Sequence, residues 1–102
     1  MIVSVMYQVA AGQKFDVDYY MKKHMPLVDS RWKSAGLKGW QVMQGTGTPT
    51  GSSAPYHVIT LLDFESLDAF KRAIDANGPE IMGDVANFTD TQPSIQFNNK
   101  LS

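Results

Sequence analysis

The sequence predicts an α+β fold of the ferredoxin-like class, in which two helices cover one face of a four-stranded antiparallel sheet. The chain has 102 residues, so we expect a single domain spanning 1–102. Strand-like and helix-like segments follow one another in the order β-α-β-β-α-β, which is typical of this sandwich. Right-handed crossovers place the first and third strands at the centre of the sheet, where we expect them to run parallel.

A strand followed by a helix is expected in the first third of the chain. Residues 2–9 are rich in β-branched and aromatic side chains and predict the strand. Asp16 has the position of a helix N-cap, and Phe15 and Tyr20 have the spacing of a hydrophobic staple. Pro26 has no backbone N–H to donate, so we expect a break or kink there. The apolar stripe of this helix consists of Val17, Tyr20, Met21, His24, Leu27 and Val28.

Two strands joined by a loop are expected in the middle of the chain. Residues 38–44 predict the second strand, and residues 45–53 have the composition of turns. Residues 55–64 give the strongest strand pattern. Their nearly continuous apolar character indicates a central strand that is covered on both faces.

The last third of the chain is expected to contain two helices and a strand. Ser66 has the position of an N-cap, and Asn77–Gly78 would stop the helix that it begins. Pro79 suits the first position of a further short helix. Residues 93–97 predict the last strand.

The residues predicted on the sheet face away from the helices are mostly uncharged and only partly apolar. They are Ile2, Ser4, Met6, Gln8, Gln41, Met43, Ser94 and Gln96. A solvated sheet face usually carries Lys and Glu, so we expect a second copy of the chain to pack there. The product would be a two-fold homodimer that encloses a shared β-barrel. The alternative is a semi-polar face that simply meets water.

Composition and charge exclude several classes of function. The chain has no Cys, which removes disulfides and thiolate chemistry, and its net charge of -1 gives no footprint for nucleic acid. No apolar run approaches the roughly 20 residues that span a bilayer, and no Lys or Arg precedes the first strand as in a signal peptide. We therefore expect a cytoplasmic protein without nucleic-acid or membrane partners. His24 and His57 lack the spacing of a metal site, so we expect no metal.

His24 is the first candidate for a functional residue. It lies four residues after Tyr20, so the two side chains share one helical face, and Tyr7 points from the first strand toward the same space. Contact with apolar surface would lower the pKa of the imidazole and leave a neutral base near pH 7. A His with one or two Tyr can abstract a proton next to a carbonyl and stabilise the resulting oxyanion. The alternative is a structural histidine that is hydrogen-bonded to a tyrosine or to a carbonyl freed by Pro26.

Aromatic residues elsewhere provide candidates for a ligand site. They are Trp32, Trp40, Tyr56 and Phe88, although aromatic residues at this density are more often part of the core. Asp90 precedes the last strand, where it either caps a turn or closes the mouth of a pocket, and we favour the turn. His57, near the start of the third strand, is either a strand-end or an interface residue.

Two segments of the chain resemble signatures of the EthD family. Residues 15–27, Phe-Asp-Val-Asp-Tyr-Tyr-Met-Lys-Lys-His-Met-Pro-Leu, resemble the first, and residues 80–96, Glu-Ile-Met-Gly-Asp-Val-Ala-Asn-Phe-Thr-Asp-Thr-Gln-Pro-Ser-Ile-Gln, resemble the second. The resemblance extends over nearly the whole chain and implies a dimeric α+β barrel. By position, His24 matches the family's recurring histidine, and Asp90 and Pro93 belong to the second motif.

The resemblance leaves the reaction open. The wider barrel superfamily includes cofactor-independent monooxygenases, muconolactone isomerases, polyketide cyclases and haem-degrading proteins. One hypothesis is therefore an enzyme without a cofactor, an oxidoreductase, isomerase or cyclase, that acts on an aromatic, polyketide-like or lactone molecule. In it His24 is the base, Tyr7 and Tyr20 donate hydrogen bonds, and Trp32, Tyr56, Phe88 and Asp90 bind the substrate. The other hypothesis is a non-catalytic small-molecule-binding or accessory protein, with haem as one candidate ligand through His24.

Overall fold

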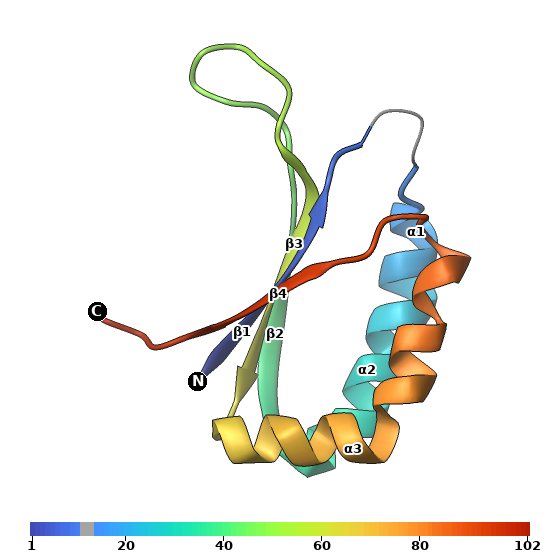
Figure 1. Cartoon of the computed structure of the whole chain (residues 1–102), viewed down its shortest axis with the longest axis vertical. Coiled ribbons are helices and arrows are strands. Elements are labelled where there is room, and N and C mark those ends of the chain that lie inside the picture. The colour runs from blue at the N-terminus through green and yellow to red at the C-terminus, as the bar shows by residue number, and fades with distance from the viewer. Residues whose placement is uncertain (11–13) are drawn as a thin grey trace.

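The computed structural model describes residues 1–10 and 14–102 and contains one helical layer packed on one sheet. In chain order its elements are β1 (Ile2–Gln8), α1 (Val17–Tyr19), η1 (Tyr20–His24), α2 (Met25–Trp32), η2 (Lys33–Ala35), β2 (Leu37–Gln44), β3 (Tyr56–Phe64), α3 (Leu67–Gly83), η3 (Val85–Asn87) and β4 (Ser94–Asn98). Figure 1 shows the helices along one side of the strands, with the opposite side bare. The predicted α+β class and the four-stranded antiparallel sheet are confirmed.

The sheet has the strand order β2-β3-β1-β4, and each adjacent pair is antiparallel. The first and third strands are central, as predicted, but the expectation that they run parallel is wrong. The crossover through the first helix makes β1 and β2 run in the same direction. β3 reverses direction after the loop and lies between them, so it is antiparallel to both. Within this chain only the helix-facing side of β3 is covered, so the prediction of cover on both faces is also not met.

The first helix begins as predicted but continues past the proline. The Asp16 carboxylate accepts a hydrogen bond from the Tyr19 N–H at 3.0 Å, and the rings of Phe15 and Tyr20 lie 5.1 Å apart, which confirms the cap and the staple. Instead of a break there is a π-helical turn over Tyr20–His24, and α2 follows with Pro26 in its first turn. In a regular α-helix the ring of Pro26 would clash with the carbonyl four residues earlier. The wider π-helical turn lies immediately before Pro26, at the place where this clash would occur.

The last helix is a single element where two were predicted. Ser66 is the N-cap, as expected, and its Oγ accepts a hydrogen bond from the Ala69 N–H at 3.1 Å. Helical hydrogen bonding then continues through Asn77–Gly78 to Gly83, with Pro79 inside the helix. The predicted stop therefore becomes a bend, which Figure 1 shows where α3 turns to run beside α2. Because of this bend, one helix covers both the end and the side of the sheet.

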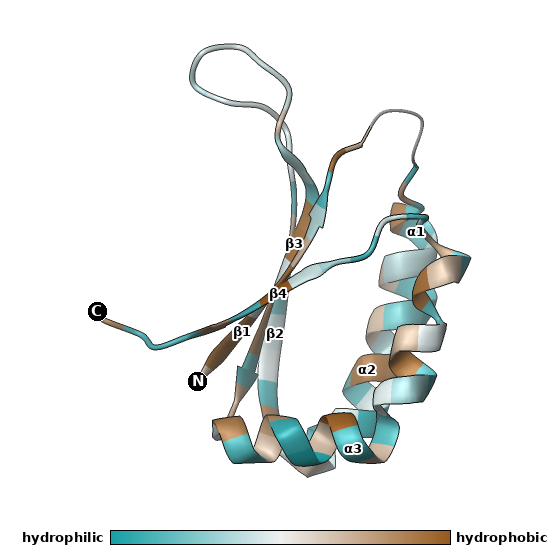
Figure 2. Ribbon diagram, viewed as in Figure 1, coloured by the Kyte–Doolittle hydropathy of each residue, from teal (hydrophilic) through white to brown (hydrophobic). Residues whose placement is uncertain are grey.

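The two faces of the sheet differ in burial. On the helix-facing side the central strands β1 and β3 carry buried side chains, which include Val3, Tyr7, Val58, Thr60 and Leu62. The register places Ser4 beside Leu61 and Gln96, and Met6 beside Ile59 and Ser94, on the other side. This bare face contains the eight residues predicted for it. In Figure 2 the long loop between β2 and β3 is pale or teal, whereas brown segments lie along the strands and on α2 and α3.

Candidate functional site

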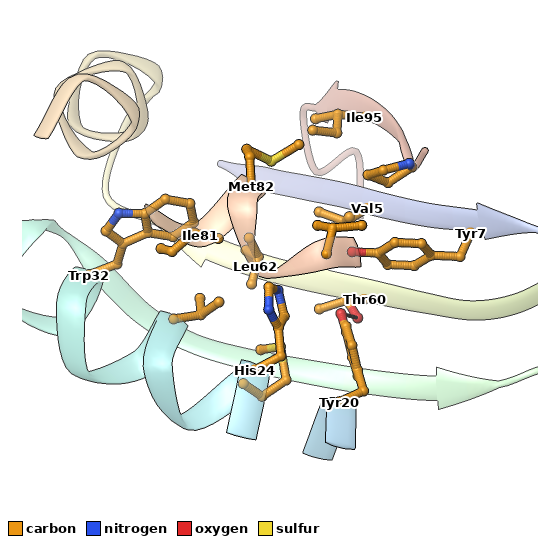
Figure 3. A pocket seen from close by; sticks show the side chains of 14 residues that line it. Val5, Tyr7, Tyr20, His24, Trp32, Thr60, Leu62, Ile81, Met82 and Ile95 are labelled. Atoms are coloured by element: carbon orange, nitrogen blue, oxygen red, sulfur yellow. Dashed lines mark hydrogen bonds between the residues drawn. The ribbon is translucent and has the colours of Figure 1, made fainter. Parts of the chain in front are cut away.

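A pocket lies between the helical layer and the sheet, and its cavity volume is about 40 Å³. The lining is mostly apolar, and Figure 3 shows the polar side chains of His24, Tyr7, Tyr20 and Thr60 among the apolar ones. The lining residues are Val5, Tyr7, Tyr20, His24, Met25, Val28, Trp32, Thr60, Leu62, Ile81, Met82, Val85, Pro93 and Ile95. Met82 and Ile95 are 40% and 44% exposed, so they form the side of the pocket that opens to solvent.

The π-helical turn sets the position of His24. In this turn the Met25 N–H donates to the Tyr20 carbonyl, five residues back, and residues four apart remain neighbours on one face of the helix. The imidazole of His24 consequently stacks on the Tyr20 ring, with centroids 5.2 Å apart and an interplanar angle of 22°. The Phe88 ring lies 4.7 Å from the imidazole as a second apolar neighbour. His24 is only 4% exposed, and it lines the pocket.

Asp84 binds the Nδ1 atom of His24. This residue follows α3, and its Oδ2 lies 3.0 Å from Nδ1. Its other oxygen, Oδ1, accepts hydrogen bonds from the Tyr19 hydroxyl at 2.6 Å and from the Asn87 amide at 2.9 Å. Three side chains from both halves of the chain therefore hold one carboxylate.

Burial and this carboxylate act in opposite directions on the imidazole. Burial lowers the pKa of His24 and outweighs the neighbouring Asp84 carboxylate, which raises it. Burial on its own would raise the pKa of Asp84, but the hydrogen bonds from Tyr19, Asn87 and His24 together lower it. At neutral pH the pair is therefore a neutral imidazole next to an ionised carboxylate.

Three hydroxyl groups lie between the helical layer and the sheet, that of Tyr20 from η1 and those of Tyr7 and Thr60 from the strands. The Tyr20 hydroxyl and the Thr60 Oγ1 are 2.6 Å apart, and the Tyr7 ring packs edge-on against Tyr20 with centroids 5.8 Å apart. Burial, followed by the adjacent Tyr20 phenol, raises the pKa of Tyr7 far above its usual range. Burial also raises the pKa of Tyr20, although the hydrogen bond with Thr60 lowers it. Both phenols therefore remain protonated and can donate hydrogen bonds.

The structure brings together some of the predicted site residues but not all. His24, Tyr7, Tyr20 and Trp32 line the pocket, although the Trp32 Nε1–H is already used in a hydrogen bond to the Ala73 carbonyl at 3.1 Å. Phe88 is buried behind His24 and is a packing residue.

Other predicted residues lie away from the pocket. Tyr56 and Asp90 are not among the lining residues, and Asp90 is exposed in the bend before β4. The Trp40 Nε1–H donates to Asp29 at 3.0 Å and so links β2 to α2. His57 lies where the register between β1 and β3 shifts, with its ring 6.1 Å from that of Phe15, so it is a strand-end residue.

The residues that support His24 were not predicted from the sequence. Asp84, Tyr19 and Asn87 give no signal in the sequence beyond their places in or near the two EthD-like motifs. Thr60 did have a signal, because it is the polar residue between Val58 and Leu62 in an otherwise apolar inward-facing row.

Two kinds of ligand do not fit these residues. No group of three or more His, Cys, Asp or Glu is placed to hold a metal ion in the part of the chain that the structure describes. Haem would take the free nitrogen of His24 as an axial ligand. A porphyrin, however, is far larger than the cavity of about 40 Å³ in this conformation. The pocket in this conformation therefore does not fit haem.

Solved structures with this fold include two from the EthD group. One is an EthD-like protein from Ralstonia eutropha JMP134, with 30% sequence identity and a TM-score of 0.92 over 99% of this chain and 91% of that chain. Another is an ethyl tert-butyl ether d (EthD) family protein from Bacillus halodurans C-125, with 17% identity, a TM-score of 0.64 and coverage of 96% and 97%. HapK from Hahella chejuensis is 10% identical, with a TM-score of 0.58 and coverage of 100% and 96%.

The last two of these structures are too distant in sequence to show more than the fold. No family model matches the sequence, and neither does any curated protein. The similarity to the Ralstonia eutropha protein is stronger, because 30% sequence identity extends over nearly all of both chains. The chain belongs to the EthD-like family.

Proposed function

We propose that the pocket binds a small hydrophobic molecule with one oxygen-bearing end, and that His24 acts on this molecule as a base. The observation that carries the proposal is the position of His24. Its Nδ1 is engaged by Asp84, while the ring lines a mostly apolar pocket that also contains the phenols of Tyr7 and Tyr20. Ligand pockets with this composition use a few polar groups to orient an otherwise apolar ligand.

The arrangement supports abstraction of a proton from a carbon next to a carbonyl group. The free nitrogen of His24 would take the proton, and the electron pair of the C–H bond would move into an enolate. Hydrogen bonds from Tyr7 and Tyr20, which remain protonated, would stabilise the negative oxygen. In an isomerisation the imidazolium then returns the proton to another carbon, so no co-reactant is consumed. Aromatic ketones, polyketide-like molecules and lactones all contain such a carbon.

The size of the pocket restricts how a ligand enters. A cavity of about 40 Å³ is far smaller than the roughly 300 Å³ or more of a pocket for a drug-sized ligand. A ring-sized ligand therefore requires Met82 and Ile95 to move away from the mouth. Both side chains are partly exposed, and the unbranched side chain of Met changes conformation at low cost. We thus propose entry between α3 and β4.

A second candidate is a binding protein without catalysis. The contacts of His24 with Tyr20, Phe88 and Asp84 would equally hold a purely structural imidazole. In that case the pocket binds its ligand, but no proton leaves the ligand.

A pair of matched probes separates these functions. Acetophenone has a carbonyl group and exchangeable methyl hydrogens, and ethylbenzene has the same carbon skeleton without the oxygen. The proposal predicts that acetophenone raises the melting temperature more than ethylbenzene does. It also predicts that the protein accelerates deuterium exchange of the methyl group in D₂O, followed by NMR, and that His24→Gln removes this acceleration. Binding without exchange supports the binding protein, equal stabilisation by the two probes contradicts recognition of an oxygen-bearing end, and no stabilisation by either probe contradicts both functions.

We also propose that the bare face of the sheet binds a second copy of the chain. The support is its composition, since the eight predicted residues on it are uncharged. The charge at one end of this face is already partly compensated. The Asp63 carboxylate lies 3.9 Å from the N-terminal amine of Met1 and 3.8 Å from the Lys38 Nζ. An identical face could cover this surface without burying an unpaired charge.

A further inference from the structure

The Asp84 carboxylate has more hydrogen-bond partners than the end of a helix requires. Its two oxygens receive contacts from Tyr19, His24 and Asn87, and the Asn87 amide also lies 3.3 Å from the Tyr19 hydroxyl. The His24 contact joins residues 60 positions apart in the sequence, and the Tyr19 contact joins residues 65 apart. These four residues form a closed network between the first helix and the end of α3.

The network distinguishes the two oxygens of Asp84. Oδ1 accepts two hydrogen bonds, from the Tyr19 hydroxyl and from the Asn87 amide. Oδ2 is left to face Nδ1 of His24 at 3.0 Å. An ionised carboxylate has no hydrogen to donate, so the hydrogen of this bond must be on Nδ1. In a neutral imidazole the lone pair is then on Nε2.

We propose that Asp84 is a positioning residue, which fixes His24 as the Nδ1–H tautomer and thereby keeps the Nε2 lone pair available to the pocket. The value of this lone pair for proton abstraction rests on the proposed function, but the tautomer itself does not. Tyr19 and Asn87 support the same arrangement, because they hold Oδ1 and so prevent the carboxylate from rotating about its side-chain bond.

This geometry makes a specific prediction for Asp84→Asn. Two donors, from Tyr19 and Asn87, point at the position of Oδ1, so the amide oxygen of the new side chain will occupy that position. The NH₂ group must then face Nδ1 of His24. Because NH₂ donates a hydrogen bond, Nδ1 becomes the acceptor and the hydrogen moves to Nε2. The substitution therefore reverses the tautomer while changing the shape of the site very little.

The tautomer is measured directly by NMR. In protein labelled with ¹⁵N-histidine, long-range ¹H–¹⁵N correlations identify the protonated nitrogen of His24 at a pH above its titration. The contacting groups that titrate are the Asp84 carboxyl and the Tyr20 phenol, and neither changes its charge near neutral pH. We expect Nδ1–H in the unaltered protein, Nε2–H in Asp84→Asn, and Nδ1–H in the control Asp75→Asn, which replaces an exposed carboxylate within α3.

Several outcomes would overturn the proposal. Nε2–H in the unaltered protein contradicts it, and this measurement is sufficient if Asp84→Asn does not fold. Nδ1–H in a folded Asp84→Asn also contradicts it, because Asp84 would then not determine the tautomer. The deuterium exchange of acetophenone is measured separately on the same proteins. Loss of exchange in Asp84→Asn to the level of His24→Gln supports a role in catalysis, whereas a confirmed tautomer without any exchange rejects only the proposed enzyme.

Discussion

At the scale of single residues, the buried imidazole of His24 makes folding sensitive to acid. The pKa of His24 in the folded protein is below the usual 6.5, mainly because of burial. Between these two pKa values His24 is therefore protonated in the unfolded chain but neutral in the folded one. The free energy of unfolding should therefore fall as the pH decreases below 6.5, toward the folded-state pKa. The lowered pKa of Asp84 adds a further loss as the pH falls below its usual 3.8.

Urea denaturation between pH 7.5 and 5 measures this effect. We expect stability to decrease over this range in the unaltered protein and to decrease less in His24→Gln, which cannot take up a proton at this position. Equal slopes for the two proteins would show that His24 does not carry the proton linkage.

The hydroxyl pair between Tyr20 and Thr60 is a second test at the residue scale. Both groups are fully buried, and their oxygens are 2.6 Å apart. Thr60→Val keeps the shape of the side chain but removes one partner, so we expect a loss of about 1–2 kcal/mol in the free energy of unfolding. The double variant Tyr20→Phe with Thr60→Val should lose less than the sum of the two single variants. Additive losses would mean that the two hydroxyl groups do not interact.

At the scale of elements, the junction between η2 and β2 depends on Gly36. Its φ angle of 109° lies in the region that favours glycine, and a Cβ there would be 2.9 Å from the Cβ of Ala69. Gly36→Ala combines backbone strain with a clash against α3, so we expect a loss of more than about 1 kcal/mol.

Gly83→Ala is the matched control for this glycine. A Cβ at Gly83 would meet open space near the end of α3, so we expect a neutral or slightly stabilising effect. Thermal melting of the two variants makes the comparison, and equal stability of both would contradict the role given to Gly36.

The elements themselves were predictable where local chemistry determines them. The caps at Asp16 and Ser66 use side chains that bond to the next turn, and β3 follows from its own apolar pattern. Pro26 was expected to break or kink its helix, and Pro79 was expected to begin a new helix after a stop at Asn77–Gly78, because local rules place prolines at helix boundaries. Here the surrounding packing maintains the helix, as a π-helical turn in the first case and as a bend in the second.

At the scale of the whole molecule, the proposed dimer depends on the bare face of the sheet. Leu61 lies on this face in the central strand β3, so Leu61→Lys would place a charge in the proposed interface. We expect the unaltered protein to be a dimer at micromolar concentration by size exclusion with light scattering, and Leu61→Lys to be a monomer. Met21→Lys, on the exposed side of the helical layer, is the control and should remain dimeric. A monomeric unaltered protein would contradict the dimer.

The contacts of the site between residues that are distant in the sequence could not be predicted from the sequence. Helical spacing was enough to place Tyr20 and His24 together, and strand alternation was enough to direct Tyr7 toward them. Asp84 becomes a neighbour of His24 only because α3 bends after crossing the end of the sheet, and no local pattern specifies that path. The parallel pairing was misjudged for a related reason, since strand direction depends on how many times the chain reverses before a strand enters the sheet.

The network around Asp84 also has a consequence for how this protein can be divided. One part of it comes from the first quarter of the chain and the other from the last quarter, and neither part contains both His24 and its carboxylate partner. A fragment of the chain, or a half-folded intermediate, would therefore lack the oriented imidazole. Complementation of two separately produced halves should restore the NMR signature of His24 only when both halves have docked, so this single side chain reports on completed folding.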